Sequence, residues 1–281
     1  MHAINSLVTA LFFSSGCGLC GAIAAAVSDR TLTLAHENKW LIVRGAHLPG
    51  GEIRVHYLEV YRRAGSTTMD ATLSAISHTN ELISLSDDHR VLRLRDTLAD
   101  GLIVEHRITA GNDEVDFQAT ARNPTDRRSE AHWAAPCVRV GAFTGFDAAG
   151  GKGAIDDYKG SVDYLPKCFV FLDGSLARMP TRDWETKARY SPGQVWCPAG
   201  VPKTDLSPRP LNPHMPSNGL IGCFSGDDGM ILATAWEPYQ CLFQGVARCL
   251  HSQFRLWGLQ AGETKQIRGK IYLVPNNVTA L

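Results

Sequence analysis

The chain has 281 residues, of which 28 are Lys or Arg and 28 are Asp or Glu, so its formal net charge is zero. Nucleic-acid binding depends on a surplus of basic side chains that neutralise phosphates, and this balance argues against such a partner. With 44% hydrophobic residues the chain can bury a large core, which excludes disorder by composition.

Residues 1–26 contain no charged side chain. An apolar run from Leu7 to Phe13 is followed by small residues and by Ala24-Ala25-Ala26, which suits a signal-peptidase site. We expect a signal peptide over residues 1–26 and a single domain over residues 27–281, in a secreted or periplasmic protein. The apolar stretch of the leader is short and interrupted by glycines, the first of them Gly16, so we expect no stable membrane span.

Six cysteines follow this leader, and their spacing is wide and irregular: Cys137, Cys168, Cys197, Cys223, Cys241 and Cys249. Most lie in apolar runs, where a buried free thiol is the commoner state, although one disulfide would fit an exported chain. No zinc-type spacing is present, and we expect neither a metal site nor a cofactor.

The first part of the domain has the pattern of β-strands at Thr31–Leu34, Trp40–Val43 and Ile53–Tyr61, followed by a loop or short helix over residues 64–78. At the end of the third strand, Arg62 follows an aromatic edge. A guanidinium in this place can hold a carboxylate or bond sugar hydroxyls, or it can belong to a solvated sheet rim.

From Glu81 the strand pattern is very regular. Strands recur at a spacing of roughly ten residues and alternate with polar turns, which indicates a meandering sandwich rather than a fold of alternating strands and helices. The expected strands are Glu81–Leu85, Val91–Arg95, Leu102–Ile108, Val115–Ala121 and Glu130–Val140.

The last third, Ile231 to Val274, contains three short apolar runs separated by turn residues, which is an antiparallel β pattern. The first run ends at Glu237, because Pro238 cannot donate to a ladder. Beside Trp236 and Tyr239, a carboxylate at a strand end suits sugar chemistry. The alternative is an ordinary charged strand end.

Two stretches resemble the galactose mutarotase (aldose 1-epimerase) superfamily. Residues 119–126, Ala-Thr-Ala-Arg-Asn-Pro-Thr-Asp, are similar to the turn before the strand that carries the family's catalytic acid, and His132 falls at that acid. Residues 258–263, Gly-Leu-Gln-Ala-Gly-Glu, resemble the family's closing turn, and Glu237 lies near the family's catalytic base. The resemblance spans roughly residues 80–274 and implies an all-β antiparallel super-sandwich.

The chain also departs from the family pattern. Around its acid the family has Asn-His and then Tyr-Phe-Asn, whereas this chain has Ala131-His132-Trp133-Ala134-Ala135-Pro136. A second family histidine is expected near residues 162–171, where the nearest polar candidates are Tyr164 and Lys167. The resemblance therefore implies that the acid–base pair is kept while the groups that orient the substrate differ.

Residues 190–218 are dense in proline and cannot form a helix or an inner strand. This arm carries Trp196 and His214, which would suit a sugar-binding rim, although a structural wrap over the sheet is an equal alternative. We predict that the arm packs over one rim of the sheet and brings Trp196 or His214 to the cleft. His251 lies in an apolar strand, where it either faces the cleft or is a structural histidine.

The leading functional hypothesis is an aldose-epimerase-like enzyme whose partner is a sugar or polysaccharide. Glu237 would take the anomeric hydroxyl proton and His132 would protonate the ring oxygen. A ring of Trp133, Trp196 or Trp236 would stack on the sugar. The alternatives are a polysaccharide lyase, with Arg62 neutralising a uronate, and a glycan-binding domain without catalysis. A Gly-x-Ser-x-Gly motif is missing, which argues against an α/β-type serine hydrolase.

Overall fold

The computed structural model describes residues 30–65, 71–146, 163–183, 195–206, 211–245 and 247–281. The predicted signal peptide lies outside these residues. The described chain is built almost entirely from antiparallel strands, as predicted, with one short helix, α1 (Ala71–Ser74). Three 3-10 turns complete it: η2 (Leu165–Lys167), η3 (Lys203–Asp205) and η4 (Val278–Ala280). None of the described helices has the length and apolar character that a membrane crossing requires.

One sheet has seven strands in the order β1-β2-β3-β9-β15-β14, and β4 also pairs with β3. Its strands are β1 (Thr33–Glu37), β2 (Trp40–Arg44), β3 (Glu52–Arg63), β4 (Ala75–Ile76), β9 (Ala131–Arg139), β14 (Tyr239–Gly245) and β15 (Cys249–Arg255).

The other sheet has nine strands in the order β11-β10-β12-β13-β16-β8-β7-β6-β5. Its strands are β5 (His78–Leu85), β6 (Val91–Leu98), β7 (Ile103–Ala110), β8 (Glu114–Arg122), β10 (Cys168–Leu172), β11 (Ser175–Arg178), β12 (Pro216–Phe224), β13 (Met230–Glu237) and β16 (Thr264–Pro275).

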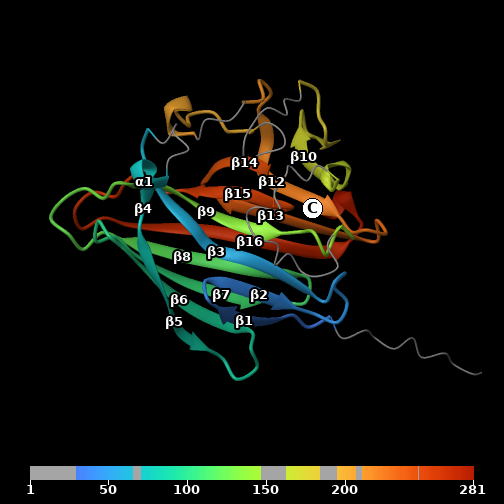
Figure 1. The fold of residues 1–281 in the computed structure, drawn as a ribbon, viewed down its shortest axis with the longest axis horizontal. Helices are drawn as coiled ribbons and strands as arrows, with labels where there is room; N and C mark the ends of the chain where they lie inside the picture. The colour runs from blue at the N-terminus through green and yellow to red at the C-terminus, as the bar shows by residue number, and fades with distance from the viewer. Residues whose placement is uncertain (1–29, 66–70, 147–162, 184–194, 207–210, 246) are drawn as a thin grey trace, which may run out of the picture.

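The two sheets pack face to face, and the main hydrophobic core fills the space between them (Figure 1). Aromatic rings from both sheets meet there: Trp236 lies 4.8 Å from Phe254 and 5.3 Å from Phe117, measured between ring centroids. Gly269 on β16 makes room for this stack, since a Cβ at that position would lie 2.5 Å from the Trp236 ring. The result is the predicted two-layer sandwich.

The long strand β3 departs from simple alternation. Its register against β9 shifts between His56 and Val60, so the neighbouring residues Tyr57 and Leu58 are both buried. A shift of this kind places two extra residues on one strand and turns side chains that alternation would send outward. Simple alternation would put Tyr57 and Leu58 on opposite faces of the sheet, so it does not predict that both are buried.

A polar network crosses the core beside β3. Asp96 on β6 is fully buried and accepts hydrogen bonds from the Tyr61 hydroxyl at 2.6 Å and from Asn80 at 2.5 Å. Nε2 of the buried His106 lies 3.2 Å from the same carboxylate, and its Nδ1 lies 2.9 Å from the Tyr57 hydroxyl. Every oxygen of this buried acid thus has a partner, as burial of a charge requires.

The six cysteines that the structure describes are all free thiols. The prediction that one disulfide would fit was therefore wrong for these six. The prediction of buried free thiols is confirmed for five of them, and Cys197 is partly exposed. Cys17 and Cys20 lie outside the described residues.

Candidate functional site

Residues 195–206 of the proline-rich arm lie along β14, at the edge of the seven-stranded sheet. Trp196 forms two backbone hydrogen bonds with Leu242 on β14, at 2.9 and 2.7 Å. Leu206 packs in an apolar cluster with Cys241 and Phe243 of the same strand. This attachment fixes the turn η3, which ends at Asp205, over the end of β15.

Asp205 is the centre of a closed polar cluster. Its carboxylate accepts hydrogen bonds from Arg255 at 2.5 Å and from the backbone N–H of Gly65 at 2.8 Å, and it lies 3.7 Å from Nδ1 of His132. Arg255 also donates to Gln240, whose amide donates to the backbone carbonyl of Asp205 at 3.1 Å. Arg255 and Gln240 are buried, so their hydrogen bonds hold Asp205 in a fixed position beside His132.

The surroundings of Asp205 and His132 give these two groups different charges near neutral pH. Burial alone would raise the pKa of Asp205, but the hydrogen bonds from Gly65 and Arg255 hold it below its usual value, so the carboxylate is charged. Burial lowers the pKa of His132, and the cationic neighbours Arg255, Arg128 and Lys265 lower it further against the opposing effect of Asp205. His132 is therefore a neutral imidazole near neutral pH, able to accept a proton.

An exposed aromatic ring adjoins this cluster. Trp257 is 41% exposed, and its backbone N–H donates to the backbone carbonyl of His132 at 3.0 Å. The cationic groups of Arg255 and Lys265 each lie 5.6 Å from its ring centroid. The next residue, Gly258, has a φ of 65° and passes so close that a Cβ would lie 3.0 Å from the His132 ring. Sequence analysis missed Trp257, because nothing in its local pattern sets it apart from a core residue.

Glu237 ends β13 as predicted, and its side chain is exposed. The next residue, Pro238, accepts a hydrogen bond from the N–H of Arg255 at 2.9 Å, while on the other side of β15 the carbonyl of His132 accepts from Leu256 at 2.7 Å. The backbones of Pro238 and His132 are thus two strand spacings, about 10 Å, apart. Both predicted catalytic residues lie at the same end of β15, but the carboxylate that contacts His132 is that of Asp205.

The predicted stacking residues are all buried. Trp196 is 0% exposed and Trp236 4% exposed, and both belong to the main core. Trp133 is 2% exposed, and the guanidinium of Arg62 lies 5.8 Å from its ring centroid. Arg62 itself donates to the Ser74 hydroxyl. These placements favour structural roles, because a buried ring offers no face to a sugar.

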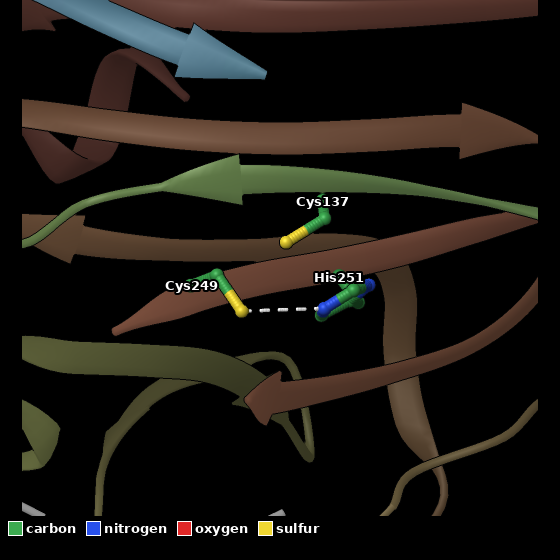
Figure 2. A group of neighbouring side chains, drawn as sticks. All are labelled: Cys137, Cys249 and His251. Carbon is green, nitrogen blue, oxygen red and sulfur yellow. Dashed lines mark hydrogen bonds between the residues drawn. The ribbon is translucent and has the colours of Figure 1, made fainter. Parts of the chain in front are cut away.

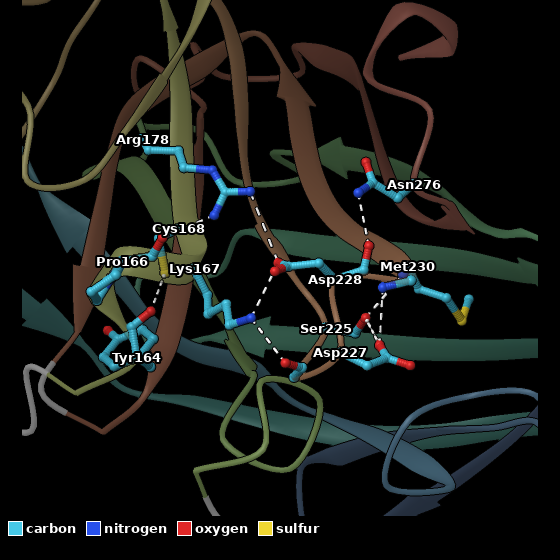
Figure 3. Close-up of polar contacts among 12 residues, drawn as sticks. Tyr164, Pro166, Lys167, Cys168, Arg178, Ser225, Asp227, Asp228, Met230 and Asn276 are labelled. Atoms are coloured by element: carbon cyan, nitrogen blue, oxygen red, sulfur yellow. Dashed lines mark hydrogen bonds and ion pairs between the residues drawn. The ribbon is translucent and has the colours of Figure 1, made fainter.

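Lys167 belongs to a separate cluster at the turn between β12 and β13 (Figure 3). Its ammonium donates to the carbonyl of Gly226 at 2.9 Å and lies 3.1 Å from the carboxylate of Asp228. Arg178 on β11 approaches the same carboxylate at 3.9 Å. These contacts hold η2 and β11 against the turn between β12 and β13, which gives Lys167 a structural role.

The remaining predicted residues are not brought to Asp205 by any contact among the described residues. The His214 ring lies 2.7 Å from the carboxylate of Asp183. Tyr239 is half-buried, and burial raises its pKa to about 12. His251 lies on β15 in contact with Cys249, in a cluster of its own.

No protein-family model matches the sequence, and no curated protein sequence matches it. Among solved structures, a candidate aldose 1-epimerase from Escherichia coli K12 is similar over 86% of this chain and 98% of its own, with a TM-score of 0.42 and 10% identity. A galactose mutarotase-like protein from Lactobacillus casei is similar over 86% and 99%, with a TM-score of 0.43 and 8% identity. Slr1438 from Synechocystis is similar over 86% and 95%, with a TM-score of 0.44 and 8% identity. At this distance the likeness carries no functional argument.

Proposed function

We propose that the end of β15 binds a saccharide, and that the protein is an isomerase acting at the anomeric carbon of an aldose. The observation that carries this proposal is the position of His132, 3.7 Å from the Asp205 carboxylate and bonded through its backbone to the exposed Trp257. An exposed indole offers a flat apolar face to a sugar ring, and a neutral imidazole beside it can move protons on the hydroxyls.

In this scheme His132 carries the proton. The neutral imidazole takes the proton from the anomeric hydroxyl, and the Asp205 carboxylate stabilises the imidazolium that forms. The imidazolium then gives the proton to the ring oxygen as the bond from the anomeric carbon to that oxygen breaks. Closure of the open-chain aldehyde by the reverse steps gives either anomer. General acid–base catalysis of this kind contributes a factor of about 100 to 10,000.

Glu237 is proposed as the second proton-transfer group. It lies at the same end of β15, across the strand from His132, and its exposed side chain is free to reach a ligand. If this carboxylate takes the single proton of the anomeric hydroxyl, His132 must start as the imidazolium that protonates the ring oxygen, which is the alternative to the scheme with His132 alone. The roles of His132 and Glu237 are separable, because only His132 has the Asp205 contact.

The test is anomer interconversion, followed by NMR or polarimetry across a panel of aldoses. We expect the wild type to accelerate mutarotation, His132→Asn to abolish the acceleration, and Trp257→Ala to weaken it mainly through KM. His214→Asn is the matched control, because that histidine pairs with Asp183 and lies outside the cluster. A wild type without effect on any aldose would overturn the proposal.

A second candidate is a polysaccharide lyase, and one observation favours it. Arg255, Arg128 and Lys265 all act on His132, so a negatively charged sugar such as a uronate would be attracted to this end of the sheet. The neutral His132 would then take the proton from the carbon next to the carboxylate, and the glycosidic C–O bond on the adjacent carbon would break as the double bond forms. The leaving oxygen would take its proton from the imidazolium or from water. Ultraviolet absorbance of unsaturated products from uronate-containing polysaccharides distinguishes this reaction. Glycan binding that survives His132→Asn, with neither activity, would identify a binding domain.

A further inference from the structure

Two thiols and an imidazole meet on the outer face of the seven-stranded sheet (Figure 2). Cys137 comes from β9, and Cys249 and His251 come from β15. Sγ of Cys249 lies 3.3 Å from Nε2 of His251, and the three potential ligand atoms lie within 4.8 Å of one another. All three residues are buried.

A disulfide does not explain this cluster. In the register between β9 and β15, Cys249 stands opposite Arg139, so Cys137 is its diagonal neighbour rather than its direct partner. Diagonal pairs in antiparallel sheets have Cα atoms about 7–8 Å apart. A disulfide spans at most about 7 Å between Cα atoms, so closing one here would need a backbone movement.

We propose that Cys137, Cys249 and His251 bind a single Zn²⁺ ion. Zinc bonds of about 2.3 Å to thiolate sulfur and about 2.0 Å to imidazole nitrogen hold the ligand atoms roughly 3.5 to 4 Å apart. The 3.3 Å between Cys249 and His251 is near this range, and the 4.8 Å limit on all three separations is compatible with it. Three protein ligands leave one coordination position for water or a ligand, as in catalytic zinc sites with two cysteines and one histidine. The zinc site is independent of the sugar chemistry proposed for His132.

Charge balance favours Zn²⁺ over Cu⁺. The cluster is buried, and an uncompensated charge there is costly. Two thiolates neutralise Zn²⁺ completely, whereas they would leave a Cu⁺ complex with a net negative charge.

The surroundings fix the ligands in place. The Phe243 ring stacks on His251 with centroids 4.2 Å apart and ring planes 7° from parallel, which sets the orientation of the imidazole. Gly245 on β14 lies beside the sulfur, because a Cβ there would be 2.5 Å from Sγ of Cys249. Gly245→Ala therefore disturbs the site without removing a ligand. The absence of a zinc motif in the sequence is explained by the origin of the ligands on two different strands.

The test is metal binding by the full chain after chelator treatment. Zn²⁺ and Co²⁺ are titrated, with stoichiometry read by metal analysis and thiolate ligation read from the charge-transfer absorption of bound Co²⁺. We expect one ion per chain, and Cys137→Ser, Cys249→Ser and Gly245→Ala should each weaken binding by at least about tenfold. Cys223→Ser is the matched control, since Cys223 is a buried thiol on β12 outside the cluster.

Four outcomes would overturn the zinc site. The first is a wild type that binds no Zn²⁺ while folded, as judged by circular dichroism. The second is a Cys223→Ser variant that loses as much binding as Cys249→Ser. The third is unchanged binding in Gly245→Ala together with unchanged binding in Cys137→Ser. The fourth is retention of Cu⁺ but not Zn²⁺, which would refute the charge argument. Should the cysteine variants fail to fold, Gly245→Ala, which keeps every ligand, decides the matter alone.

Discussion

The carboxylate of Asp205 lies 3.7 Å from Nδ1 of His132, although the two residues come from the turn η3 and the strand β9. The same carboxylate holds Arg255 at 2.5 Å. Asp205 thus favours the imidazolium form of His132, while the burial of the ring and the cationic Arg255 favour the neutral form and prevail. A pair arranged in this way suits a histidine that receives a proton and then returns it.

The first prediction is the pH dependence of activity. Burial lowers the pKa of His132 from its ordinary value of 6.5, and the proposed reaction begins with the neutral ring. Activity should therefore be full near neutral pH and fall on acidification, with the midpoint below pH 6.5. The measurement is the mutarotation rate against pH at constant ionic strength. An activity that rises as the pH falls below 6.5 would mean that the imidazolium is the active form.

Asp205→Asn tests how the carboxylate acts. Because Asp205 raises the pKa of His132 against the other influences, its loss should move the acid midpoint further down. The imidazolium also loses its stabilising charge, so kcat should fall by at least about tenfold while KM changes little. The variant leaves the buried Arg255 without a charged partner, so a thermal melt must accompany the kinetics. A lower kcat with an unmoved acid midpoint would indicate a purely structural role.

The sequence predicted the sandwich well because alternation and turn chemistry are local signals. The strands from β5 to β9 and the end of β13 at Glu237 follow directly from them. The register shift in β3 could not be predicted in this way, because it depends on how that strand meets β9. Packing of this kind decides which side chains of β3 are buried.

The site was harder to predict than the fold. His132 was found through a family resemblance, but Asp205 lies in a proline-rich segment without periodicity. The attachment of Trp196 and Leu206 to β14 brings it over β15. Trp196 was predicted to stack on a sugar because it is an aromatic residue of that segment. It is instead 0% exposed, and it attaches the segment to the sheet. The sequence shows which residues have side chains suited to a site. Which of these residues meet depends on contacts between segments that are distant in the sequence.

Glu237→Gln tests the second proposed proton-transfer group. The change is isosteric and the side chain is exposed at a strand end, so the free energy of unfolding should change by less than about 0.5 kcal/mol. Activity should fall by about 100-fold or more if Glu237 transfers a proton. Initial rates and urea unfolding are measured on the same preparations, with Glu105→Gln as the exposed control. An unchanged kcat would leave His132 as the sole proton carrier.

The last prediction concerns the buried network around Asp96. Burial alone would raise the pKa of this carboxyl, but hydrogen bonds from His106, Tyr61 and Asn80 hold it below its usual value. In Asp96→Asn one side-chain oxygen becomes an NH₂ group, which must face hydrogen-bond donors whichever way the amide turns. We expect a loss of about 3–5 kcal/mol in the free energy of unfolding near neutral pH, the typical cost of removing one buried charged partner and leaving the others in place.

The pH dependence separates this charge from ordinary packing. A carboxyl with a depressed folded pKa stabilises the protein above its unfolded pKa, near 3.8, and loses that contribution as the pH falls towards the folded value. The difference between wild type and Asp96→Asn should therefore be constant above about pH 5 and shrink in more acidic solution. Urea unfolding from pH 3 to pH 7 measures it. The control is Glu105→Gln, which removes an exposed ion pair with Arg95 and should cost less than about 1 kcal/mol. A difference that stays constant down to pH 3 would show that the carboxylate's charge contributes nothing and that shape alone matters at this position.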